Sequence, residues 1–213
     1  MVSRRTLLAV LGVAPLAACA NRPSDLAGGD DLSAWYVGSI DDEPFDVPLI
    51  NTSLLKPELR RQTVSYSGDQ KPGTIVVDID NRHLYLVGDE GEAIRYGVGV
   101  GRQGFAWSGV ATVGRKGVWP EWSPTRTMVR VGRAPAQNRK GGLDNPLGAR
   151  ALYLHQGGRD ILFRIHGTNE PWSIGDQVSS GCIRMLNEDI LDLYGRVPVG
   201  TTVLVRRNGR LRV

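Results

Sequence analysis

Residues 71–101 alternate apolar, β-forming runs with short turn signals, and this pattern restricts the fold more than any other feature of the chain. The runs IVVDI, HLYLV and AIRYGV are separated by turn residues at 80–81 and 88–91. Short runs rich in Val, Ile and Tyr that are joined by tight turns are typical of antiparallel hairpins. We therefore expect strands at about 74–79, 82–87 and 93–99 in an antiparallel meander.

The remaining body segments also favour strands. Residues 104–150 predict mostly loop, with GVWPEWSPT near the centre, whereas ALYLHQ and DILFRIHGT flank Gly157-Gly158 and predict another hairpin. TTVLVRR predicts a closing strand. The clearest helix is LNEDILDLYGRV, with Asn187 expected as N-cap and Gly195 expected to end it. Residues 71–206 are thus expected to form one mostly β domain with one or two short helices.

The first 18 residues predict an export signal. They carry two arginines, an apolar run of about ten residues and a small-residue ending, the layout of a secretory signal. The run is shorter than the roughly 20 residues that span a bilayer. LAAC at 16–19 matches the bacterial lipobox, in which Cys19 becomes the lipid-bearing N-terminus; the alternative is an ordinary signal with a chance cysteine. The paired arginines leave Sec and twin-arginine export both open.

Two segments precede the body. Residues 19–35 are rich in Gly, Asp and Ser and predict a lipid-anchored tether. Residues 36–70 predict an extension that packs on the body, with LLKPELRRQTVSY forming one short helix that leads into a strand. Ala20 follows Cys19 where inner-membrane lipoproteins carry Asp. By resemblance to known lipoproteins, this implies an anchor in the outer membrane that faces the periplasm.

Charge and ligand types argue against several classes of partner. The formal net charge of +4 falls to +2 without residues 1–18, and no run of basic residues suggests nucleic acid. Three scattered histidines and one cysteine beyond the signal give no metal-ligand spacing. GVGVGRQG lacks the following helix and acidic residue of a dinucleotide-binding fingerprint. We expect no metal, no cofactor and no nucleic acid.

The stretch VSSGCIRM contains the second cysteine, Cys182. If Cys19 carries lipid, the chain holds no other cysteine for a disulfide, so this thiol is either a buried small hydrophobe or a reactive group. Gly181 permits a tight backbone and close approach of a carbonyl. The N–H groups of Gly181 and Cys182, just ahead of a helical segment, are candidates for an oxyanion hole. Ser179 or Ser180 is the competing nucleophile, but a thiol is the better one at neutral pH.

A nucleophilic cysteine needs a base, and His166 is the best placed of the histidines. His83 and His155 lie within predicted strands, whereas His166 ends the apolar strand DILFRI and is followed by Gly167. A strand end that opens into a loop can hold a catalytic group rigidly beside a cleft. Sixteen residues separate His166 from Cys182, which leaves room for the chain to return.

From HGT at His166 to VSSGCIRM, the chain resembles the active-site signature of the L,D-transpeptidase catalytic domain family (YkuD-like). PGTIVVDIDNRHLYLV resembles the opening strands of that family, and the resemblance covers about 71–206. Many members carry His where this chain has Ser180, and others carry Ser. The resemblance implies an L,D-transpeptidase-type β-sandwich. It also implies Cys182 as nucleophile, His166 as general base, the Gly167 carbonyl as the group that orients the imidazole, and an oxyanion hole at Gly181 and Cys182.

Several residues are candidates for the substrate side. Arg184 matches the arginine that follows the family's cysteine by two positions, and it either binds a substrate carboxylate or braces the loop through an ion pair. Ser179 and Ser180 precede the nucleophile. Trp119, with the tryptophans at 122 and 172, either lines a substrate groove or anchors loops.

The implied function is a peptidoglycan L,D-transpeptidase in the periplasm. Acyl transfer from a tetrapeptide stem would release D-alanine. An amine of another stem then gives a 3→3 cross-link, and an amine of a protein, such as an outer-membrane protein, gives protein–wall attachment. The alternatives are an L,D-carboxypeptidase that uses water, a wall amide hydrolase with the same site, and a non-catalytic wall-binding lipoprotein. Acylation of Cys182 by carbapenems is a further implication of the resemblance.

Overall fold

A computed structural model describes residues 32–101, 107–132, 136–179 and 181–207. The signal segment, Cys19, most of the tether and Ser180 lie outside these ranges. Within them, no helix has the length and apolarity that crossing a membrane requires.

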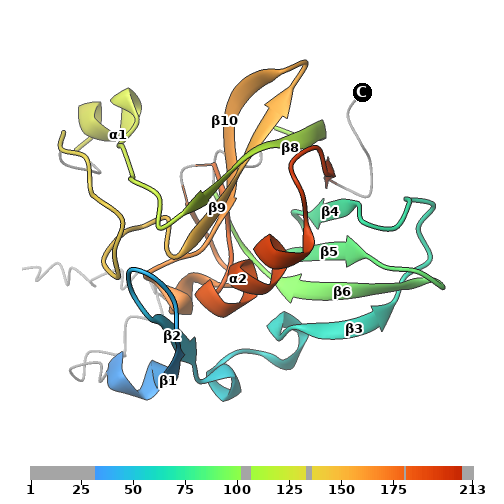
Figure 1. Ribbon diagram of the computed structural model, residues 1–213, viewed down its shortest axis with the longest axis horizontal. Helices are drawn as coiled ribbons and strands as arrows, with labels where there is room; N and C mark the ends of the chain where they lie inside the picture. Colours follow the sequence, from blue (N-terminus) through green and yellow to red (C-terminus); the bar gives the residue numbers. More distant parts are fainter. Residues whose placement is uncertain (1–31, 102–106, 133–135, 180, 208–213) are drawn as a thin grey trace, which may run out of the picture. The chain divides into compact units, whose positions relative to one another are not determined.

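Most of the body is one sheet of eleven strands, in the order β11-β7-β12-β10-β9-β8-β13-β4-β5-β6-β3 (Figure 1). In chain order the strands are β3 (Gln62–Ser65), β4 (Ile75–Asp78), β5 (His83–Val87), β6 (Glu92–Gly97), β7 (Gly99–Gly101), β8 (Gly109–Val118), β9 (Arg150–Gln156), β10 (Arg159–His166), β11 (Gln177–Ser179), β12 (Ile183–Arg184) and β13 (Thr202–Arg206). The mostly β prediction is confirmed. The expected meander is present as β4-β5-β6, which pair antiparallel, but β13 joins β4 in parallel.

A continuous stretch of chain links the two ends of this sheet. β6 and β7 are separated by Val98 alone, yet β6 lies next to β3 at one end of the sheet order and β7 next to β11 at the other. The sheet therefore curves so that its two ends approach each other around the main apolar core. That core joins Ile75 of β4 and Tyr96 of β6 to Leu152 of β9 and Ile183 of β12, all with no exposed surface. Each fully buried aliphatic side chain of this kind contributes about 1.5–3 kcal/mol to folding.

Two α-helices accompany the sheet, α1 (Arg126–Arg130) and α2 (Asn187–Arg196). Ile190 and Leu193 of α2 are completely buried in the main core, so this helix packs on the inner face of the sheet. The prediction that Gly195 ends α2 is wrong, because the helix continues to Arg196. The ammonium of Lys116 in β8 donates to the carbonyls of Tyr194 (2.6 Å) and Val197 (2.8 Å), which satisfies acceptors that a helix end leaves open.

Residues 32–65 lie against the body. They form 3₁₀ turns at Leu32–Trp35, Thr52–Leu54 and Pro57–Leu59, a hairpin of β1 (Tyr36–Ile40) and β2 (Val47–Ile50), and β3. One short helix before a strand was expected at 54–66; the two 3₁₀ turns replace it because Pro57 interrupts helical hydrogen bonding. The hairpin is fixed by a two-pronged ion pair from Arg150 to Asp42, with N···O distances of 2.8 and 2.6 Å.

Candidate active site

His166 is the last residue of β10 and is almost completely buried, with 4% of its surface exposed. Its Nδ1 lies 2.6 Å from the carbonyl oxygen of Gly167. Because a carbonyl oxygen only accepts, Nδ1 must carry the proton, which leaves the lone pair on Nε2. Burial lowers the pKa of His166 to about 4, although the bond to Gly167 opposes this shift. The imidazole is therefore a neutral base at physiological pH.

The strand β12 brings Cys182 to this histidine. β12 pairs in parallel with β10, so that Ile165 lies beside Ile183 and His166 beside Arg184. Ile165 and Ile183 face the core, and side chains alternate along a strand. Arg184 and, two residues earlier, Cys182 therefore share the opposite face with His166.

Cys182 is half-buried. Burial raises its pKa, while a hydrogen bond from the Arg164 main chain and the positive charges of Arg164 and Arg184 partly offset that effect. A neutral thiol and a neutral imidazole thus stand on one face of two paired strands, which suits proton transfer at the moment of attack.

Gly181 lies in a bend just before β12 with φ +136°, a conformation that L side chains rarely adopt. The helix expected after this segment is present as α2, but the two-residue strand β12 comes first and α2 begins at Asn187. Ser179 ends β11.

Arg184 is held in an ion pair. Its Nη1 lies 2.6 Å from Oε2 of Glu170 and 3.3 Å from Oγ of Ser173, and 15% of its side chain is exposed. It thus braces the 3₁₀ turn at Pro171–Ser173 beside the histidine, in line with the second of the two predicted roles.

The tryptophans lie in different surroundings. Trp119 is 6% exposed, packs edge-on against Phe45 and donates from Nε1 to Asp42, so it has little surface to offer a substrate. Trp122 forms an isolated β-bridge with Arg139. Trp172 is 40% exposed and stands edge-on to Trp35, and it remains able to contact a ligand.

Asn187 is a site residue that the sequence did not reveal. It is the first residue of α2 rather than its N-cap, and its side chain turns toward the loop after His166. Oδ1 accepts from the N–H groups of Ala149 (3.0 Å) and Thr168 (3.2 Å), and Nδ2 donates to the Thr168 carbonyl (2.9 Å). A side chain at Gly167 would collide with Oδ1. Asn187 therefore fixes the peptide whose carbonyl orients His166.

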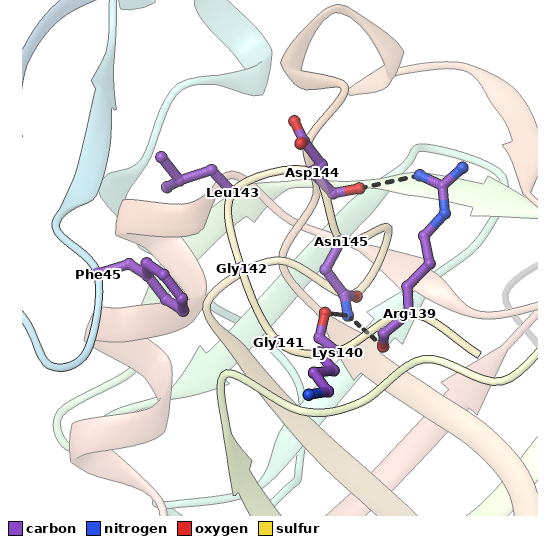
Figure 2. A pocket seen from close by; sticks show the side chains of 8 residues that line it. All are labelled: Phe45, Arg139, Lys140, Gly141, Gly142, Leu143, Asp144 and Asn145. Carbon is purple, nitrogen blue, oxygen red and sulfur yellow. Dashed lines mark hydrogen bonds between the residues drawn. The ribbon is translucent and has the colours of Figure 1, made fainter.

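Of the cavities in the described part of the chain, two bear on the candidate site. One of about 570 Å³ is formed by Phe45 and the loop 139–145, where Asn145 donates to the Lys140 and Arg139 carbonyls and Arg139 to that of Asp144 (Figure 2). It contains none of the predicted catalytic residues. Another of about 470 Å³ is lined by Thr168, Trp172 and Asn187, among others, and so borders the loop that follows His166. Within the described ranges, no three His, Cys, Asp or Glu side chains could share a metal ion.

Known proteins that resemble this chain in sequence include L,D-transpeptidases by name. The family model described as the L,D-transpeptidase catalytic domain (YkuD) matches residues 72–205. "Probable L,D-transpeptidase ErfK/SrfK" of Escherichia coli (strain K12) is 38% identical over 140 residues, covering 62% of this chain and 43% of that protein. "Putative L,D-transpeptidase YkuD" of Bacillus subtilis (strain 168) is 46% identical over 81 residues, covering 38% of this chain and 47% of that protein. The chain thus spans less than half the length of these relatives.

Solved structures are also similar. A crystal structure described as a "Probable carnitine operon oxidoreductase caia" from Brucella melitensis is 48% identical, with a TM-score of 0.50, and the match covers 71% of this chain and 96% of that one. L,D-transpeptidase 3 from Mycobacterium tuberculosis is 18% identical, with a TM-score of 0.47, over 63% of this chain and 60% of that one.

Proposed function

The chain belongs to the L,D-transpeptidase catalytic domain family, and from this premise we propose that it transfers a peptidoglycan stem peptide through a thioester on Cys182. The observation that carries the proposal is the parallel pairing of β10 with β12, which sets His166 and Cys182 on one face. The proton on Nδ1 of His166, fixed by Gly167, leaves Nε2 as the base that such a transfer needs.

Acylation follows from these groups. Nε2 of His166 takes the thiol proton while Sγ of Cys182 attacks the carbonyl of the third stem residue, which we infer to be meso-diaminopimelate. The resulting oxyanion would be held by the N–H groups of Gly181 and Cys182, in the bend before β12. The tetrahedral adduct collapses, its C–N bond breaks, and the imidazolium returns the proton to the departing amine of D-alanine.

The second half-reaction regenerates the thiol. An acceptor amine attacks the thioester and gives its proton to His166, and the C–S bond breaks as the thiol recovers that proton. An amine of another stem yields a 3→3 cross-link, an amine of an outer-membrane protein yields protein–wall attachment, and water yields carboxypeptidase action. A non-catalytic wall binder would not require this buried imidazole–thiol arrangement.

The test is mass spectrometry of the purified protein after incubation with a disaccharide-tetrapeptide, beside Cys182→Ala. We expect a transient adduct on the wild type, released D-alanine and a cross-linked dimer, all absent from the variant. D-alanine without a dimer would indicate water or a protein as acceptor. A loss of cross-links from intact wall material would indicate the amide hydrolase, and no adduct with retained wall binding would indicate the binding module.

The pH dependence of acylation follows from the lowered pKa of His166. The base must be neutral, so the rate of Cys182 acylation by a carbapenem should rise with pH around a midpoint of about 4 and then stay level through neutrality. Rapid-mixing measurements between about pH 3.5 and 8 would show this. A midpoint near 6.5, the ordinary value for histidine, would contradict the buried imidazole.

We also propose that Cys19 carries lipid and holds the enzyme at a membrane facing the periplasm, preferably the outer membrane. The lipobox sequence supports this. Cys19→Ser should prevent incorporation of labelled fatty acid, and equal labelling of the variant would exclude the anchor.

A further inference from the structure

Tyr153 of β9 lies between two guanidinium groups. The Arg115 guanidinium carbon stands 3.4 Å from the ring centroid and that of Arg164 stands 4.4 Å from it. Register explains the arrangement, because Tyr153 pairs with Arg115 of β8 on one side and with Arg164 of β10 on the other. Their neighbours at Leu152 and Ile165 face the core, so the three side chains lie on the same outer face as His166.

The two arginines differ in their charge partners. Arg164 is neutralised by Asp160, which accepts from Nη1 at 2.6 Å and from Nη2 at 2.9 Å. Arg115 is exposed, and among the described residues no carboxylate lies within ion-pair distance of it. The stack on Tyr153 thus leaves one solvent-facing guanidinium whose orientation is fixed by an aromatic ring.

This guanidinium lies within reach of a peptide bound at Cys182. The strand order β12-β10-β9-β8 places Arg115 three strands from the nucleophile's strand. At about 4.8 Å between strands, the separation is about 14 Å. An extended peptide covers that distance in about four residues.

We propose that Arg115, oriented by Tyr153, is a carboxylate-binding subsite for the acyl donor. The proposal rests on the proposed function and adds a specificity determinant to it. A planar guanidinium offers two parallel N–H donors to a carboxylate. Stacking on Tyr153 already restricts the Arg115 side chain, so that less of its conformational entropy is lost on binding. Besides the terminal carboxylate of the departing D-alanine, a stem peptide offers two carboxylates on the acyl part that is transferred: the α-carboxylate of its D-glutamate and the side-chain carboxylate of its diaminopimelate.

The experiment compares three disaccharide-tetrapeptides: unmodified, amidated at the glutamate α-carboxylate, and amidated at the diaminopimelate side chain. D-alanine release gives kcat and KM for the wild type, Arg115→Gln and Arg196→Gln. Arg196 is a matched control because it is exposed on α2, which packs on the opposite face of the sheet. For the unmodified substrate we expect Arg115→Gln to raise KM roughly tenfold with kcat nearly unchanged, and Arg196→Gln to leave both unchanged.

The amidated substrates identify the carboxylate. For the one whose carboxylate meets Arg115, the wild type should show the same roughly tenfold rise in KM, and Arg115→Gln should add nothing to it. The other amidated substrate should behave like the unmodified one. Arg115→Lys, which keeps the charge but not the planar fork, should give an intermediate KM.

Other outcomes overturn the proposal in distinguishable ways. An unchanged KM for Arg115→Gln, or an equal rise for all three substrates, would exclude a contact with either carboxylate of the acyl part while the proposed function stands. Turnover of none of the three by the wild type, with no adduct at Cys182, would remove the proposed function and the subsite with it. Circular dichroism and thermal melting should show that each variant is folded.

Discussion

Alanine at Cys182 and glutamine at His166 are each expected to lower kcat/KM for D-alanine release by about 10³-fold or more. Alanine removes the attacking sulfur. Glutamine retains a polar side chain but offers no basic nitrogen to receive the thiol proton. Because both groups act in the same proton transfer, the double variant should be hardly slower than either single one. Steady-state D-alanine release from a disaccharide-tetrapeptide would measure all three.

The matched controls are glutamine at the other two histidines. Nε2 of His83 contacts the Glu58 carbonyl, and the His155 ring lies over Gly114, so neither has a place in the proton transfer. Both variants should keep wild-type kcat/KM. A collapse of activity in Ser179→Ala or Ser180→Ala with Cys182 intact, to the level of Cys182→Ala, would instead identify a serine nucleophile.

Alanine at Asn187 is expected to lower the free energy of unfolding by about 2–4 kcal/mol and also to reduce kcat. The substitution leaves the N–H groups of Ala149 and Thr168 and the Thr168 carbonyl without their partner, and each such buried group costs about 1–3 kcal/mol. Water can enter from the neighbouring cavity of about 470 Å³ and bind these groups, so the loss of stability should stay below the sum of the three separate costs. Urea unfolding at pH 7 would measure the loss.

A purely structural role would leave kcat of the folded fraction unchanged. Since Asn187 fixes the loop that carries the Gly167 carbonyl, we expect kcat to fall about tenfold with little change in KM, because the imidazole is less well oriented. Asn187→Asp keeps an acceptor for both N–H groups and loses only the donor to Thr168, so it should recover part of the stability and of kcat. Equal kcat for the alanine variant and the wild type would exclude the positioning role.

The periodicity and the motifs of the sequence were sufficient to predict those features that depend on residues close together in the chain. Strands expected at 74–79, 82–87 and 93–99 are found at Ile75–Asp78, His83–Val87 and Glu92–Gly97. The HGT and SSGC segments likewise placed His166 at a strand end and Gly181 in a bend, because chemistry and backbone conformation there depend on a few adjacent residues.

Features that arise from contacts between distant residues could not be predicted. Asn187 looked like a helix cap, but its partners at Ala149 and Thr168 lie 38 and 19 positions away. Gly195 looked like a helix stop, but Lys116, 78 positions from Tyr194, binds the helix end instead. Trp119 looked available to a substrate, and only the folded chain shows that Asp42 and Phe45 enclose it.

The direct passage from β6 to β7 bears on when the protein becomes active during folding. Ile183 pairs with Val100, some 80 positions earlier, and with Ile165 on its other side. The two-residue strand after the nucleophile is therefore held by residues that are distant in the sequence. Contacts between residues so far apart in the sequence form slowly, because closing the loop costs chain entropy before the contact contributes any stabilisation. The thiol and the imidazole should therefore meet only when β12 has paired with both β7 and β10, and an incompletely folded chain should carry an inert cysteine rather than a weakly active one.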